Sequence, residues 1–170
     1  LVSLGQYGPG TVTDIDIAST GTTFALATSR GVRLYNTDTL ERIETPISEA
    51  DIHTRSVLYN SDGTRLAVTQ GGTLDIWDVA AGTVLDTLDT GDGNVQVIGW
   101  DEAAGRIATH GCIRGPDLSH ACDLYATRLW DLETDEIINT VEHASLNSQP
   151  KVSADLTRLL WSEYYPVQDV

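Results

Sequence analysis

The stretch Leu74-Asp75-Ile76-Trp77-Asp78 decides the fold, because a similar one, Thr127-Arg128-Leu129-Trp130-Asp131, occurs later in the chain. A third version, Val32-Arg33-Leu34-Tyr35-Asn36, precedes both. In each, side chains of different character alternate before a large aromatic residue, which is typical of a β-strand with two unlike faces. A strand pattern that returns along the chain predicts a repeat architecture.

The strands between these copies are spaced in the same way. A turn followed by an apolar residue recurs at intervals of about 42, 41 and 52 residues, ending at Phe24, Leu66, Ile107 and Leu159. Within one unit the turns divide four short strands, at residues 56–59, 65–69, 73–78 and 83–88. No capped helical periodicity interrupts them, so we expect very little helix.

These residues resemble the WD-repeat β-propeller family. The Trp-Asp pairs at 77–78 and 130–131 match the end of the family's third strand, and residues 59–67 are similar to its Phe-Ser-Pro-Asp-Gly segment. The resemblance covers essentially the whole chain, and an all-β sandwich is the alternative. It implies an all-β propeller of four-stranded antiparallel blades, about four in number, with Tyr35, Trp77, Asp78, Trp130 and Asp131 as structural blade residues.

The resemblance also divides the chain into blades. Residues 1–4 form an outer strand of a preceding or closing blade, and the later blades cover 11–45, 54–88, 94–141 and, incompletely, 147–170. Three arrangements are open: a segment of a larger propeller, two copies pairing in one ring, or a lone four-blade ring. We favour the segment, because the pattern stops inside a strand. An unclosed array would expose edges and apolar faces, and therefore assemble with itself or with further blades.

Packing rather than polar networks is expected to hold the blades together. The loops after the second strands lack the family's usual Asp, reading Arg30-Gly31 and Gly71-Gly72, and only His143 falls near the family's Gly-His position. Losing a buried strand-three aromatic residue should therefore cost about 3–5 kcal/mol.

Composition limits the partners. The 170 residues include 25 acidic and 10 basic ones, for a formal net charge of −15, and Lys151 is the only lysine. Binding to nucleic acid or to an anionic membrane surface is disfavoured, because both need clustered cations. No apolar run is long enough for a membrane helix.

The third blade carries an insertion at 110–124 that contains both cysteines, Cys112 and Cys122. Three interpretations are open: a disulfide, worth about 3 kcal/mol; a metal such as Zn²⁺ held with His110 and His120; or free thiols. A disulfide would imply an oxidising compartment, so localisation leans towards the extracytoplasmic or secreted side without being settled.

Function is expected to be binding. No catalytic or phosphate-binding motif occurs, no cofactor is expected, and the resemblance implies a scaffold for a protein or peptide partner. The alternatives are a hydrolase or lyase with a metal at the loop face, and a structural sensor module. Asp14 and Asp16 could line a channel or lie at a solvated edge, and residues 89–94 look like a turn more than a Ca²⁺ loop. The candidate contact face comprises Arg30, His110, Arg114, His120, His143, Tyr164 and Tyr165.

Overall fold

The computed structural model describes residues 10–45, 47, 53–91, 94–114, 122, 124–143 and 150–162, with only the backbone at Arg114. This part of the chain contains fourteen β-strands and no helix, which confirms the expected all-β class. In the same residues, no helix that could span a membrane is found. The predicted outer strand at 1–4, and the end of the last unit at 163–170, lie outside the described residues.

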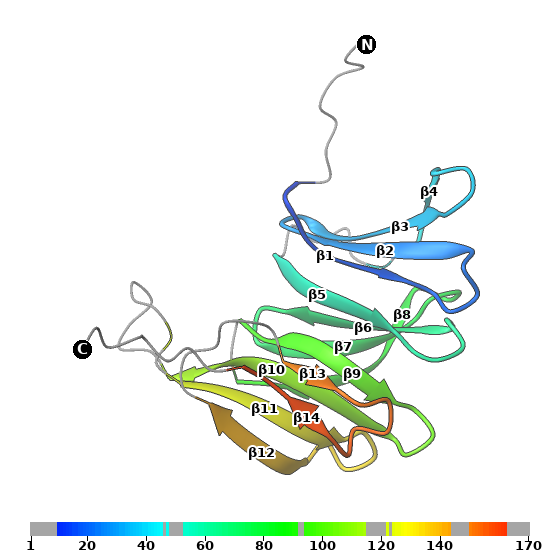
Figure 1. The fold of residues 1–170 in the computed structure, drawn as a ribbon. Helices are drawn as coiled ribbons and strands as arrows, with labels where there is room; N and C mark the ends of the chain where they lie inside the picture. Colours follow the sequence, from blue (N-terminus) through cyan, green and yellow to red (C-terminus); the bar gives the residue numbers. More distant parts are fainter. Residues whose placement is uncertain are drawn as a thin grey trace.

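Three four-stranded antiparallel sheets follow one another along the chain, each a meander of neighbouring strands. Figure 1 shows them stacked in chain order, with β1, β5, β9 and β13 side by side along one edge of the stack. The first sheet has β1 (Val12–Ile17), β2 (Thr23–Thr28), β3 (Gly31–Asn36) and β4 (Arg42–Ile43). The second has β5 (Thr54–Tyr59), β6 (Arg65–Gln70), β7 (Thr73–Asp78) and β8 (Thr83–Asp89). The third has β9 (Gln96–Asp101), β10 (Arg106–Arg114), β11 (Leu124–Asp131) and β12 (Ile137–His143).

The fourth unit is smaller. Its described residues, 150–162, contain a two-stranded antiparallel sheet, β13 (Lys151–Val152) and β14 (Leu159–Leu160). The sequence predicts an incomplete blade at 147–170, and its last part, 163–170, lies outside the described residues. Even so, this unit packs on the third sheet through β13 and β9.

Two apolar cores lie between the sheets, one on each side of the second sheet. Successive side chains of β6 point to opposite faces of the sheet and so contribute to both cores. Leu66 and Val68 belong to the core shared with the first sheet, and Ala67 belongs to the core shared with the third. The strand-three aromatic residues pack in the same cores: Trp77 against the first and Trp130, only 4 % exposed, within the second. This confirms that the strand-three tryptophans lie between stacked sheets.

The third and fourth strands of each sheet meet in the same turn. The residue after the aromatic position accepts hydrogen bonds from backbone N–H groups two or three residues ahead, as Asp131 Oδ1 does from Glu133 and Thr134 at 2.9 and 3.2 Å. The fourth residue after this capping residue has the left-handed backbone conformation. The capping residues are Asn36, Asp78 and Asp131, and the left-handed ones are Leu40, Gly82 and Asp135.

Side-chain oxygens also join the innermost strands of neighbouring sheets. Asp14 Oδ2 accepts from Val57 N at 3.1 Å, and Asp16 Oδ2 accepts from Tyr59 N at 2.7 Å. These carboxylates therefore bond to β5, which neither sequence interpretation, a channel lining or a solvated edge, had anticipated. Burial raises the pKa of Asp14, and the backbone N–H groups of Val57 and Ile15, which donate to its carboxylate, partly offset this rise.

Polar bonds inside the sheets depart from the expectation of packing alone. In the third sheet, Trp130 Nε1 donates to Thr109 Oγ1 at 2.8 Å in a buried setting. In the second sheet, Trp77 Nε1 is buried and has no hydrogen-bond partner among the described residues. The expectation that packing alone holds the blades together is therefore wrong for the third sheet, where the indole of Trp130 forms a buried hydrogen bond. It holds for the indole of Trp77 in the second sheet.

Candidate functional site

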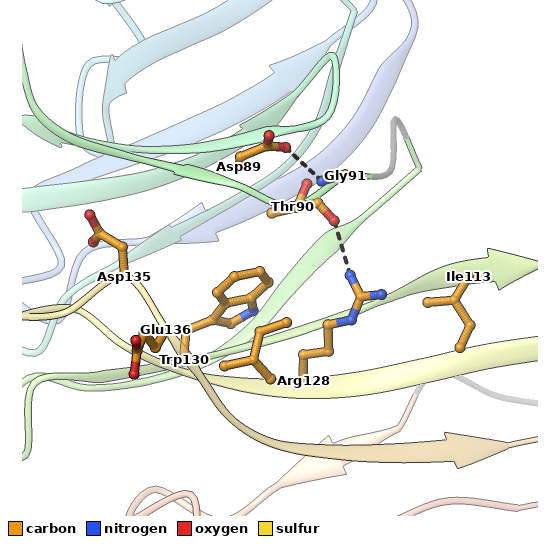
Figure 2. A pocket seen from close by; sticks show the side chains of 9 residues that line it. Asp89, Thr90, Gly91, Ile113, Arg128, Trp130, Asp135 and Glu136 are labelled. Atoms are coloured by element: carbon orange, nitrogen blue, oxygen red, sulfur yellow. Dashed lines mark hydrogen bonds between the residues drawn. The ribbon is translucent and has the colours of Figure 1, made fainter.

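A groove of about 580 Å³ opens between the second and third sheets, and we call it the interblade groove. Residues from the end of β8, from β10 and β11, and from the β11–β12 turn line it, as Figure 2 shows. It forms because neighbouring sheets converge at their inner strands and separate towards their outer ones. The lining residues are Asp89, Thr90, Gly91, Ile113, Arg128, Trp130, Asp135, Glu136 and Ile137.

The apolar part of the groove comes from three residues of the third sheet. Trp130 presents its indole, fixed from behind by its bond to Thr109. Ile137, 46 % exposed at the start of β12, lies beside the turn, and Ile113 lies near the end of β10. An exposed isoleucine next to a fixed indole is a suitable contact for an apolar side chain of a partner.

The charged part of the groove has one cation and three carboxylates. Arg128 Nη1 donates to the backbone oxygen of Thr90 at 2.9 Å, so this guanidinium links the two sheets. Asp89 Oδ1 accepts from Gly91 N at 2.9 Å, which agrees with a turn at this point. Asp135 and Glu136 lie exposed in the β11–β12 turn, where Asp135 has a φ of 59°. Among the described residues their carboxylates form no ion pair, and they stand at the rim opposite the end occupied by Ile113 (Figure 2).

The described residues of the predicted insertion extend the β10–β11 hairpin. β10 continues to Arg114 and pairs with β11 down to Leu124, and a disulfide joins Cys112 to Cys122 with a Cα–Cα distance of 5.8 Å. Of the three interpretations, the disulfide is therefore correct. No group of three or more potential metal ligands occurs among the described residues. The cross-linked hairpin also holds Ile113, which follows Cys112 directly, at the groove.

A buried polar cluster joins His110 of this hairpin to His143 at the end of β12. Thr127 Oγ1 lies 3.1 Å from His143 Nε2 and 3.4 Å from His110 Nδ1. The His110 ring stacks on Tyr125, and the His143 ring lies against Trp161. Burial, and then the neighbouring His143, lower the pKa of His110 to about 4. The imidazole of His110 is therefore neutral at pH 7.

Only some residues of the candidate contact face lie among the described residues. His110 and His143 are 6 % and 2 % exposed, so their imidazoles are buried and do not offer the exposed contact expected of them. Arg30 is exposed in the β2–β3 turn of the first sheet. Arg114 is described by its backbone alone, and His120, Tyr164 and Tyr165 lie outside the described residues.

Sequence reasoning missed most of the groove. Asp135, Glu136 and Ile137 follow the second Trp-Asp motif after three intervening residues, and this position was the available signal. This signal was insufficient, because the repeat pattern indicates no more than an ordinary turn at these residues. They line the interblade groove because Asp89 and Thr90 of the preceding unit lie on its other side.

Comparison with known proteins supports the fold. No protein-family model matches the chain, and no curated protein matches it. Among solved structures 736 chains match. A chain in "Crystal Structure of Mitotic Checkpoint Complex" is similar, with a TM-score of 0.63 and 18 % identity over 89 % of this chain. This chain covers 42 % of that one, less than half of its length.

The fold is that of β-propeller blades. Stacked four-stranded meanders, inner strands side by side and aromatic residues between sheets carry this conclusion. At 18 % identity the likeness shows the fold alone.

Proposed function

We propose that this chain is a propeller-type scaffold that binds a protein or peptide partner and catalyses no reaction itself. The interblade groove carries the proposal, since it joins an exposed apolar contact, Ile137, to a fixed indole and a charged rim. Such a combination, with aromatic and apolar anchors inside a polar border, is typical of surfaces that recognise proteins. The solved structure similar to this chain is a complex by its title, which agrees with such a role.

The chemistry of the groove supports binding over catalysis. Its lining residues include carboxylates and one guanidinium, but no Ser, Cys or His paired with a base. Its guanidinium already bonds to the backbone of Thr90 and serves as a link between sheets.

The proposal includes completion of the ring by further blades, from the same protein or from a second copy. Ile15 and Ile17 are 55 % and 58 % exposed on β1. They alternate with Asp14 and Asp16, which bond to the second sheet, so the isoleucines face the opposite way. An exposed apolar sheet face supports the packing of another blade there.

A peptide library tests the proposed function. The disulfide-bonded chain is panned against a random peptide library displayed on phage, in parallel with the variants Ile137→Ala and Ile138→Ala. Ile138 is the matched control, because it is 45 % exposed against 46 % for Ile137 but does not line the groove. We expect enriched peptides to lose affinity for the Ile137 variant alone. Enrichment that is equal on both variants would place recognition elsewhere and overturn the proposal.

A further inference from the structure

The geometry points to a specific occupant of the interblade groove: an extended peptide segment of a partner protein in which an aliphatic side chain stands next to a basic one. This inference rests on the proposed function and adds the chemistry of the ligand. The aliphatic side chain would lie on Ile137 and Ile113, with the largely buried indole of Trp130 behind them, and the basic side chain would face Asp135 and Glu136.

Charge is the first argument. Three carboxylates and one guanidinium line the groove, and the guanidinium bonds to the Thr90 carbonyl. The rim therefore has a negative excess close to an apolar floor. A nearby apolar surface lowers the effective dielectric constant, so an arginine or lysine of the ligand gains more here than at an open surface.

Charge also decides between kinds of ligand. A second copy of this chain would bring a formal net charge of −15 to an acidic rim, and a phosphorylated segment would bring further negative charge. A basic segment has the opposite sign and would also be attracted from a distance by the acidic chain as a whole.

Backbone bonding is the second argument, because one N–H group in each of the outer strands β8 and β12 is already bonded by a side-chain oxygen. In β12 the N–H of Thr140 is bonded at 2.8 Å by Oδ1 of the preceding Asn139. In β8 the N–H of Thr87 is bonded at 2.8 Å by Oδ1 of the preceding Asp86. A peptide added as a further strand would need to displace these oxygens, so recognition falls to side chains in the groove.

The shape of the groove fits such a ligand. A volume of about 580 Å³ lies within the range of small-ligand sites, and the groove is open to solvent rather than enclosed. The β11–β12 turn places Asp135, Glu136 and Ile137 consecutively along the rim, so one short segment reaches the acidic and apolar contacts together.

The test uses a fluorescein-labelled synthetic peptide with one leucine adjacent to one arginine in a Gly-Ser background. Two matched peptides replace the arginine by glutamate or the leucine by serine. Fluorescence anisotropy measures binding to the whole disulfide-bonded chain at low and at high salt. We expect the Leu-Arg peptide to bind at least about tenfold more tightly than either matched peptide, and more weakly at high salt.

Variants of the protein locate the binding. Asp135→Asn with Glu136→Gln removes the rim charges, and asparagine tolerates the left-handed backbone of residue 135. We expect this variant to lose the preference for arginine over glutamate, and Ile137→Ala to lose the preference for leucine over serine. Glu133→Gln, in the same turn but outside the groove lining, and Ile138→Ala are the controls, and both should retain the two preferences.

The outcomes separate this inference from the proposed function. Equal binding of the arginine and glutamate peptides, or the same loss in Glu133→Gln, would overturn the inference. Library peptides that depend on Ile137 but carry no basic residue would also overturn it, while leaving the scaffold function intact. Library peptides that ignore Ile137 would overturn the proposed function itself.

Discussion

At the residue scale, His110 shows how burial changes the chemistry of one side chain. Its ring faces His143 across Thr127 and stacks on Tyr125, and its pKa is about 4 against an ordinary value of 6.5. Between these two values the unfolded chain takes up a proton at this position and the folded chain does not. Folding therefore becomes less favourable as the pH falls through this window.

We expect the free energy of unfolding to decrease by at most about 3 kcal/mol between pH 6.5 and pH 4 because of His110. Denaturant unfolding across this range measures the decrease, and the variant His110→Gln should show a smaller one. Asp62 and Asp155 do not confound this window, because their hydroxyl and amide donors lower their pKa values from 3.8. An unchanged pH dependence in the variant would assign it to other groups.

The two strand-three tryptophans differ at the same scale. Trp130 Nε1 donates to Thr109 Oγ1, whereas Trp77 Nε1 has no partner among the described residues. We expect Trp130→Phe to destabilise the protein by about 1 kcal/mol more than Trp77→Phe, because only the first loses a buried hydrogen bond. A double-mutant cycle with Thr109→Val isolates this bond by chemical denaturation. Additive effects of the two substitutions would mean that the bond contributes nothing to stability.

At the element scale, the outer strands show how a propeller blade protects its free edge. Asp86 and Asn139 occupy equivalent places in β8 and β12, since the residues that follow them pair with Asp75 and Arg128. Each bonds the next N–H at 2.8 Å, an N–H group that another strand could otherwise bind.

Removing these oxygens should increase self-association. We expect Asp86→Ala with Asn139→Ala to shift the sedimentation velocity distribution towards larger species at the same protein concentration. Asp86→Asn is the control, because it removes a charge and keeps an oxygen acceptor. If the control associates as strongly as the alanine variant, net charge rather than edge protection keeps the chains apart.

At the scale of the whole molecule, the packing of neighbouring sheets depends on close steric fit as well as on buried apolar area. A Cβ added to Gly99 in β9 would lie 2.4 Å from Val152 Cγ2 and 2.7 Å from Leu156 Cδ2 of the fourth unit. Leu156 has a φ of 53°, at the turn position occupied by Gly21, Gly63 and Gly105 in the earlier units. The packing of its side chain over Gly99 offsets this backbone strain.

Gly99→Ala should therefore weaken the docking of the fourth unit. We expect a loss of about 1–3 kcal/mol in chemical denaturation, which is typical of overpacking in a tight core. Val152→Ala in the same chain should restore part of this loss, because it removes the nearest clashing atom. Failure of the second substitution to restore stability would show that backbone preference at residue 99, rather than contact between units, sets the cost.

The amino-acid sequence by itself determined the blade. The recurring strand with Tyr35, Trp77 or Trp130, and the turns between strands, predicted units of four short strands, and the resemblance to the WD-repeat family implied that these are antiparallel blades with aromatic blade residues. This was possible because strand alternation and turn chemistry are local properties that side chains show within a few residues.

Only the tertiary structure decided the candidate site. The groove joins Asp89 and Thr90 of one unit to Trp130 and Glu136 of the next, and no local pattern reports such a meeting. The same holds for the buried histidines, which the sequence had placed on an exposed face. Burial and charge environment depend on what the neighbouring sheet brings within contact distance, and that follows from the stacking of the units rather than from the sequence of any one of them.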